Sequence, residues 1–409
     1  MDELPIGRRV AYWRRRRRMS QQVFADRLGK SKSWVDKVER GVRRLDRFSV
    51  IHQIADVLGV EPATLLGPAA AQRGAASGRP VGAVEIEELR AALERCDRIG
   101  LWSRPVSSPP DLGELRKAVR HAWLTYQSAR GGVLARSLPE LLHRSQAAAA
   151  AHPYGEEGEQ TAHLLGQVYQ ITSSVLRNLG EYELAWLAAD RAVAVAVRSG
   201  DELLAGAASF RVGMALLALG RARSALEVHL TVANRLAPAD SRQATPQRLS
   251  VYGMLLLQGA MAAARLGDEA TVRELVSAAS EAADRLGGDR NHYWSSFGPT
   301  NVLLHRAAAA VELGDAKTAV ATHERIRGHA LSGLVTERRV HHLLDVARGC
   351  TQLGDVARAA ALLMECDRLA PAELSSRPLG RTVVGEVIRR TRGEPPPVLR
   401  DLATAAGVA

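Results

Sequence analysis

The amino-acid sequence predicts an all-α protein, with a small N-terminal helical domain followed by a long array of paired helices. Aromatic residues make up only 4% of the chain. Its cores must therefore be built mainly from Ala, Leu and Val, which suit close-packed helices better than strands. Apolar residues recur at helical spacing. The dipeptide Leu-Gly also returns at intervals of 40, 47, 47 and 40 residues, each time between two helix-like segments.

Positive charge is concentrated near the N-terminus. Residues 1–67 contain 15 Lys and Arg against 8 Asp and Glu, a net charge of +7, whereas the whole chain carries +11. Such asymmetry indicates a terminal module that binds nucleic acid or an anionic membrane surface. We therefore expect residues 1–67 to form a separate domain.

Two short helices joined by a glycine-containing turn are predicted inside this domain. Ser20 is a suitable N-cap for "QQVFADRL", and Gly29 is suited to end that helix. Ser31 or its neighbour can cap a second helix, "SKSWVDKVERG", which stops at Gly41. This arrangement is a helix-turn-helix. The residues of the motif expected to face its core are Val23, Phe24, Leu28, Val35 and Val38. A preceding helix contributes Ile6, Val10 and Trp13, and a following helix contributes Phe48, Ile51, Ile54, Ala55 and Leu58. A last helix is expected at 62–66.

The stretch "IGRRVAYWRRRRRMSQQVFADRLGKSKSWVDKVERGVRRLDRFSVIHQIADVLGVEPATLL" resembles the five-helix DNA-binding domain of the XRE family, which includes phage repressors. The resemblance covers residues 6–66 and includes the order of helix caps, the turn glycine, "ERG" and the closing "VLGV". It implies a protein that binds a double-stranded DNA operator, with the second helix of the motif in the major groove.

The resemblance also implies roles for single residues. Gln21 matches a glutamine that bonds a DNA phosphate, and Arg14 and Glu39 match an internal ion pair that ties the first helix to the recognition helix. Five arginines in a row, 14–18, point in all directions on a helix. The run is not expected to be a localisation tag, because it lies inside a folded helix. The residues expected to contact DNA are Gln21, Lys32, Ser33, Trp34, Asp36, Lys37, Arg17, Arg44 and Arg47.

Within this set, the resemblance places Lys32, Ser33 and Lys37 at positions that reach base edges, with Trp34 and Asp36 beside them. Lysine can donate to O6 and N7 of guanine. The two lysines are five residues apart and do not point the same way, so a phosphate contact is the alternative for Lys37. The loop arginines 44 and 47 match phosphate and minor-groove contacts.

Residues 68–82 are predicted to be a flexible linker, because they are rich in Gly, Ala and Pro and lack a hydrophobic period. "AVEIEELRAALERCDRI" is a plausible amphipathic helix after it, and residues 103–113 are a second irregular stretch. Residues 83–409 are expected to form one helical domain.

This domain contains an internal repeat. Leu-Gly occurs at 179–180, 219–220, 266–267, 313–314 and 353–354, after one apolar helix and before an Ala-rich one. The glycine would end the first helix, and small residues would let the second pack closely. The pattern resembles tetratricopeptide repeats (TPRs), whose basic period is about 34 residues, with loops added between units. We expect a TPR-like α-solenoid that begins with a helix pair at 114–151 and is capped by residues 377–408.

The whole chain resembles bacterial regulators that join an XRE domain to a TPR-like sensor, a plan shared with peptide-responsive quorum-sensing regulators. The resemblance implies a sequence-specific transcriptional regulator whose TPR-like domain senses a peptide or small molecule and mediates dimerisation. A homodimer is expected because one short recognition helix reads few bases, so that two half-sites are needed. The alternative is a TPR interaction scaffold whose basic N-terminal domain binds nucleic acid without sequence preference.

One stretch of the array, "DRNHYWSSFGPTNVLLHR", is a candidate ligand site. It holds three of the 17 aromatic residues of the chain together with amide and imidazole side chains, a combination that suits a ligand pocket. The alternative is that the rings fill the junction between two repeats. The candidate residues are Asn291, His292, Tyr293, Trp294, Phe297, Asn301 and His305.

Several classes of protein are disfavoured. There is no P-loop, no GxGxxG after a strand, no GxSxG and no protease Cys/His pattern, so we expect neither an enzyme nor a bound cofactor. His341 and His342 are adjacent, and His323 and His329 are six apart, which does not place two metal ligands on one helix face. No metal site is expected.

The sequence favours a cytoplasmic protein. Its three cysteines, Cys96, Cys350 and Cys366, fit no metal or redox spacing and suit a reducing compartment. The N-terminus lacks the apolar core of a signal peptide. No stretch is long and apolar enough to predict a membrane span.

Overall fold

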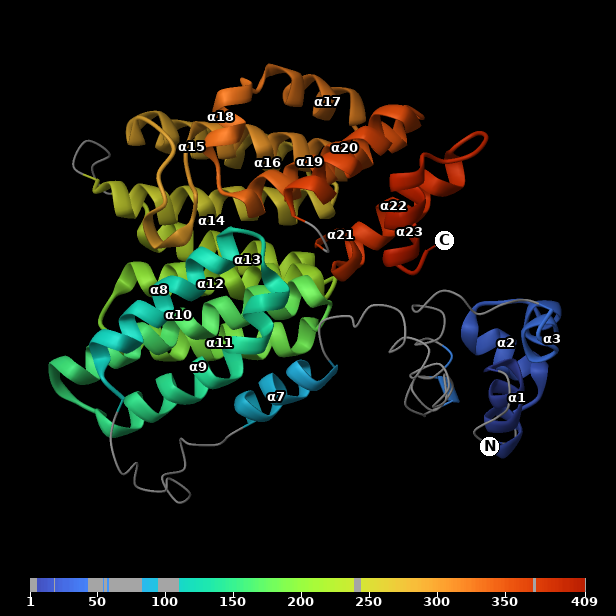
Figure 1. Cartoon of the computed structure of the whole chain (residues 1–409), viewed down its shortest axis with the longest axis horizontal. Coiled ribbons are helices and arrows are strands. Elements are labelled where there is room, and N and C mark those ends of the chain that lie inside the picture. The colour runs from blue at the N-terminus through green and yellow to red at the C-terminus, as the bar shows by residue number, and fades with distance from the viewer. Residues whose placement is uncertain are drawn as a thin grey trace. The chain divides into compact units, whose positions relative to one another are not determined.

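The computed structural model describes residues 6–17, 19–42, 54, 57–58, 83–94, 110–238, 244–370 and 373–408. Regular structure in this part of the chain is helical apart from one isolated bridge between Arg290 and Phe297, so the predicted all-α class is confirmed (Figure 1). The chain divides into two compact units, Met1–Pro80 and Val81–Ala409. The predicted linker, 68–82, lies outside the described residues. No helix of the described ranges has the length and apolar character needed to cross a bilayer.

The N-terminal unit contains α1 (Ile6–Arg16), α2 (Gln21–Leu28) and α3 (Lys32–Glu39). The amide of Val23 donates to Ser20 Oγ at 3.2 Å, and that of Trp34 donates to Ser31 Oγ at 3.1 Å, so both predicted N-caps are present. Gly29, at φ 62°, ends α2 in the left-handed conformation. These two caps and one glycine place α2 and α3 only three residues apart.

The core of this unit consists of Val10, Phe24, Ala25, Leu28, Val35, Ile54 and Leu58. Val23 was expected in this core, but its side chain is 44% exposed. The expectation was wrong because α2 is short and its buried stripe passes through residues 24, 25 and 28, leaving Val23 on the flank. Phe48, Ile51, Ala55 and the predicted helix at 62–66 lie outside the described residues.

The second unit is the predicted array of helix pairs, stacked from the green helices α10 and α11 to the orange helices α19 and α20 in Figure 1. Its helices are α7 (Ala83–Glu94), α8 (Leu112–Gln127), α9 (Gly131–Ala151), α10 (Gly155–Leu179), α11 (Tyr182–Arg198), α12 (Glu202–Ala218), α13 (Ala222–Leu236), α14 (Pro246–Arg265), α15 (Glu269–Leu286), α16 (Pro299–Glu312), α17 (Ala316–Arg325), α18 (Gly328–Gly333), α19 (Thr336–Gln352), α20 (Val356–Leu369), α21 (Glu373–Ser376), α22 (Pro378–Arg390) and α23 (Pro397–Ala405). A short 3-10 helix, η2 (His292–Trp294), lies between α15 and α16.

Each of the five repeated Leu-Gly dipeptides, 179–180, 219–220, 266–267, 313–314 and 353–354, forms the turn within a helix pair. All five glycines are left-handed, with φ between 74° and 91°, and the amide that follows each glycine donates back to the carbonyl of the first helix. In three turns this following residue is an aspartate that also caps the next helix. Asp268 accepts from Thr271 N at 3.0 Å, and Asp315 and Asp355 do the same at 3.1 Å for their own helices. One short turn thus satisfies the end of one helix and the start of the next.

We predict that Gly267→Ala destabilises the second unit by about 1–2 kcal/mol, because an L-residue is strained at φ 74°. Gly328→Ala is the matched control. Neither glycine has an atom within 4 Å of an added Cβ, but only Gly267 has a positive φ. At Gly328, alanine should instead stabilise by about 0.4–1 kcal/mol through loss of unfolded-chain freedom. Urea unfolding of the full chain measures both, and equal effects would rule out the conformational explanation.

Candidate DNA-binding surface and central cavity

A buried ion pair joins α1 to α3. Arg14 Nε lies 2.5 Å from Glu39 Oε1 and Nη2 lies 2.9 Å from Oε2, and both side chains are less than a tenth exposed. Arg14 also donates to the carbonyl of Met19 at 2.7 Å, which fixes the start of the turn before α2. The ion pair expected from the sequence is confirmed. It fixes the recognition helix against the rest of the unit.

Gln21, the first residue of α2, is bound to the same carboxylate. Its Nε2 donates to Glu39 Oε2 at 2.9 Å, so its side chain is oriented before any DNA is bound. An amide nitrogen carries two donors, and one of them remains for a phosphate oxygen. The position at a helix N-terminus also suits an anion.

The outer face of α3 is polar. Lys32, Ser33 and Lys37 are exposed, whereas Val35 and Val38 on the opposite side are buried. The other two expected contacts are half-buried: Trp34 packs against the core, and Asp36 forms an i,i+4 pair with Arg40 at 3.4 Å. Lys32, Ser33 and Lys37 are thus accessible on the side of α3 that faces away from the core, and their contact with DNA stays a prediction.

The other residues expected to contact DNA are Arg17, Arg44 and Arg47. Arg17 Nε donates to the carbonyl of Leu58 at 2.9 Å, so this side chain takes part in holding the unit together. Arg15 and Arg16 are exposed on α1, and Arg16 donates to the Tyr12 hydroxyl at 2.9 Å. The loop arginines 44 and 47 lie outside the described residues.

In the second unit, the aromatic loop before α16 is tied to distant helices. Tyr293, Trp294 and Ser296 all have positive φ values, between 49° and 57°, a strained conformation for side chains of this kind. The hydroxyl of Tyr293 donates to both oxygens of Asp201, at 2.9 and 3.1 Å. The hydrogen bonds from Tyr293 to Asp201, the N-cap of α12, therefore help to stabilise this strained backbone.

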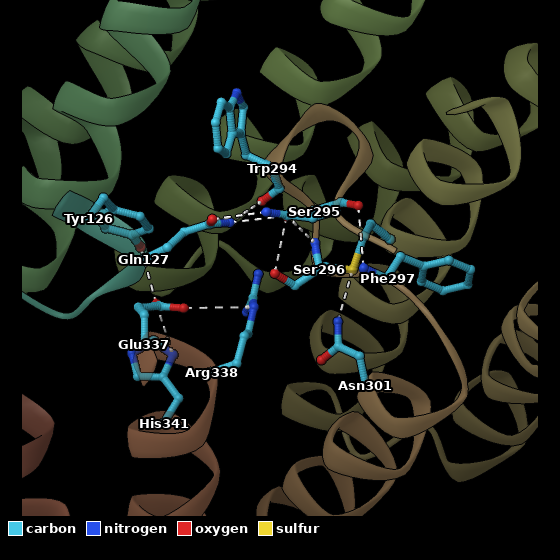
Figure 2. A network of polar contacts seen from close by, with 12 residues as sticks. Tyr126, Gln127, Trp294, Ser295, Ser296, Phe297, Asn301, Glu337, Arg338 and His341 are labelled. Atoms are coloured by element: carbon cyan, nitrogen blue, oxygen red, sulfur yellow. Dashed lines mark hydrogen bonds and ion pairs between the residues drawn. The ribbon is translucent and has the colours of Figure 1, made fainter. Parts of the chain in front are cut away.

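The indole of Trp294 stacks on that of Trp123 from α8, with ring centroids 5.4 Å apart and planes 12° apart. Both indole nitrogens donate to Gln167 Oε1, at 3.0 and 3.1 Å. Asn291 and Gln127 exchange two amide hydrogen bonds, at 2.9 and 3.1 Å. Figure 2 shows Gln127 reaching the backbone of this loop, where its Nε2 donates to the carbonyl of Trp294 at 3.5 Å.

Phe297 is fully buried, and its ring lies against Gly253, where an added Cβ would come within 2.0 Å of the ring. His292, Tyr293 and Trp294 line a small cavity of about 280 Å³. The geometry of Tyr293, Trp294 and Phe297 is that of rings packed between repeats, and ligand binding by them stays a prediction.

A larger cavity, of about 450 Å³, lies inside the array. Its walls come from the first helices of successive pairs, α10, α12, α14, α16 and α19, together with α22. Asn301 and His305 belong to these walls, whereas Asn291 and Phe297 line neither this cavity nor the smaller one. The seven candidate residues thus do not form one site.

Arginine dominates the charge of this central cavity. The lining contains four arginines and a single carboxylate, Asp345. Burial raises the pKa of Asp345 to about 6. Burial also lowers the pKa of His305 to about 4 and the pKa of His342 to about 3, so these two imidazoles are neutral at pH 7. The arginines are Arg177, Arg265, Arg338 and Arg377.

Glu337 is a buried carboxylate next to the cavity lining, and it interacts with several side chains around it (Figure 2). It accepts from the Tyr126 hydroxyl at 3.1 Å and lies 3.5 Å from His341 Nδ1 and 3.7 Å from Arg338 Nε. Burial alone would raise the pKa of Glu337, but His341 and the surrounding guanidinium groups hold it below its ordinary value. Glu337 is therefore ionised and shared among several donors.

Sequence reasoning named Asn301 and His305 but missed the other cavity residues, although a signal for some of them was present. Arg177 and Asn178 directly precede Leu179-Gly180, and Arg265 directly precedes Leu266-Gly267. These polar residues in the last turns of α10 and α14 line the cavity. The structure also pairs His323 with His342, at 3.0 Å, and no group of three side chains able to hold a metal lies within the described ranges.

Residues 5–66 match a family model described as "Helix-turn-helix domain", which confirms the predicted N-terminal module. No curated protein sequence matched the chain. Among solved structures, the chain is similar to Bacillus thuringiensis PlcR, crystallised in complex with the peptide PapR7 and DNA. The two are 12% identical, the match covers 87% of this chain and 98% of that chain, and the TM-score is 0.35.

We predict that Glu39→Ala destabilises the N-terminal unit by about 3–5 kcal/mol, because it leaves Arg14 buried without its partner. Asp36→Ala is the control. It removes an exposed pair at 3.4 Å and should cost less than about 1 kcal/mol. Amide hydrogen exchange of α1–α3 in the full chain measures both. Similar protection in the two variants would contradict the structural role of the buried pair.

We predict that Trp294→Ala lowers the stability of the second unit by up to about 3 kcal/mol, through loss of packing and of the Trp123 stack. Trp186→Ala on α11 removes a ring that is 39% exposed and should cost clearly less. Urea unfolding gives the comparison. If Trp294→Ala is as mild as Trp186→Ala, the loop ring is not part of the packing between repeats.

Proposed function

We propose that this chain is a sequence-specific DNA-binding transcriptional regulator of the bacterial cytoplasm. The observation that carries the proposal is the exposed polar stripe of α3, held by the buried Arg14–Glu39 pair on a helix-turn-helix scaffold. Side chains on such a stripe can reach base edges in the major groove. Phosphate contacts from the start of α2 would set the position of the unit on the duplex.

The proposed roles follow from placement. Lys32 and Ser33 stand at the N-terminal end of α3, the end that enters the groove in this motif. Lys37 lies one turn further on and serves either a base or a phosphate. The expected contacts from Trp34, Asp36, Arg17, Arg44 and Arg47 remain part of this proposal.

The regulator would act as a homodimer on two half-sites about 34–36 Å apart, since one eight-residue recognition helix reads few base pairs. The second unit would carry the dimer contacts and the sensor. The central cavity supports a sensor role because its walls come from successive helix pairs, so that an occupant contacts several repeats at once. A ligand that prefers one curvature of the array would shift operator affinity, by no more than its differential affinity for the two states.

The test is a selection of bound sequences from random duplex DNA, followed by affinity measurements on selected and random DNA over a salt series. Both kinds of DNA will show salt dependence from counterion release. A regulator retains a specificity ratio of about 10³ or more at physiological salt. A ratio near one would instead support the scaffold alternative, with a basic unit that binds nucleic acid without sequence preference.

We predict that Lys32→Ala loses about 1–3 kcal/mol of discrimination at particular base pairs of the selected site. Lys117→Ala is the matched control, because it removes the same charge from an exposed position on α8 in the other unit. Binding of each variant to single-base-pair changes in the site separates them. An unchanged sequence preference in Lys32→Ala would remove this residue from base reading.

A further inference from the structure

The unused hydrogen-bonding groups of the central cavity point to the chemistry of its occupant. We propose that the cavity binds a carboxylate-bearing ligand that also carries N–H donors, with Arg177 and Arg338 receiving the carboxylate. This inference rests on the proposed sensor role and specifies what is sensed.

The first argument is the balance of charge. Of the four lining arginines, Arg265 pairs with Glu312 at 2.6 Å, and Arg377 pairs with Glu373. The closest carboxylate to Arg338 is Glu337, at 3.7 Å, and that carboxylate already accepts from Tyr126. The lining therefore holds more positive charge than its own carboxylates neutralise.

Arg177 is the least satisfied of these groups. Its Nη2 atom is buried and has no hydrogen-bond partner within the described residues. A buried guanidinium N–H group without an acceptor is costly, and a guanidinium group offers paired donors that match a carboxylate. Arg177 and Arg338 line the same cavity, so that one occupant of the cavity can face both guanidinium groups.

The second argument is a set of neutral polar atoms on the same walls. Asn178 Oδ1, Asn301 Oδ1 and His342 Nδ1 are buried and lack a partner in the described part of the chain. Asn301 is fully buried, and its amide nitrogen donates to Met254 Sδ at 3.3 Å, which leaves the oxygen on the other side (Figure 2). His342 is 2% exposed, and its Nε2 faces His323.

These atoms define what accompanies the carboxylate. Amide oxygens accept hydrogen bonds, so they suit N–H donors and would repel further anionic oxygens such as those of a phosphate. A carboxylate with nearby N–H groups occurs in acylated or free amino acids and at the C-terminus of a short peptide. The volume of about 450 Å³ falls within the range of about 300–1,000 Å³ typical of small-ligand pockets.

The experiment follows thermal unfolding of the full chain at constant ionic strength with three probes. These are N-acetyl-trialanine with a free C-terminus, the same peptide with a C-terminal amide, and N-acetylalanine. We expect the free acid to raise the unfolding midpoint with concentration and the amide to have no effect. N-acetylalanine as effective as the peptide acid would identify a small acid as the source of the carboxylate. If neither acid exceeds a matched sodium chloride control, the proposal is overturned.

Two variants locate the effect. Arg177→Gln removes the guanidinium group whose Nη2 lacks a partner, so it should leave the midpoint without probe little changed and weaken the response about tenfold or more. Arg338→Gln should weaken the response in the same way, and it tests the assignment independently if Arg177→Gln folds poorly. The control is Arg390→Gln on α22, which pairs with Glu386 at 2.7 Å and lies outside the cavity lining. A full response in both cavity variants would overturn the assignment.

The outcome is separable from the regulator proposal. A chain that distinguishes selected from random DNA but ignores both acids fails only this inference. A chain that is stabilised by the free acid through Arg177 and Arg338, yet shows no DNA sequence preference, fails only the regulator proposal and keeps the ligand site.

Discussion

The backbone of five glycines underlies the architecture of the second unit. Each glycine adopts a left-handed conformation that other residues reach only with strain, and it reverses the chain between two helices. Because the same turn recurs, the first helices of successive pairs line one cavity. The aspartates that follow three of these glycines add a second condition, since they close one helix and cap the next. The position of every cavity residue depends on this repeated geometry.

Buried arginine has different consequences in the two units. In the helix-turn-helix, Arg14 has a bidentate partner and two helices are fixed together. In the array, burial lowers the pKa of Arg211 to about 10, so it remains charged at pH 7, between the rings of Phe210 and Trp123 at 4.5 and 5.4 Å. Arg177 and Arg338 lie near enough to influence that pKa. Paired arginine stabilises a fixed shape, whereas an excess of arginine makes the interior receptive to an anion.

The parts of the structure that sequence predicted are those set by local rules. Ser20, Ser31 and the turn glycines follow from capping and backbone preferences, which act over a few residues. The prediction that Val23 faces the core was wrong, because the neighbouring helices decide how many residues of a short helix are buried. The candidate ligand residues between 291 and 305 are separated in the structure, because neighbours in sequence can face different sides of a solenoid. Asn301 lines the central cavity, whereas Phe297 lies in the core, and ligand binding stays a prediction. Arg177 and Arg338 are 161 positions apart in the sequence and line one cavity only because several repeats stack.

The stacked indoles of Trp123 and Trp294 have a practical consequence. They join α8, near the start of the array, to the loop before α16, so their overlap depends on how the intervening repeats are bent. Two indoles at 5.4 Å couple electronically, and the coupling gives a near-ultraviolet circular dichroism signal that is sensitive to their mutual angle. The near-ultraviolet circular dichroism of this indole pair would therefore change with the curvature of the array, in solution and without an added label.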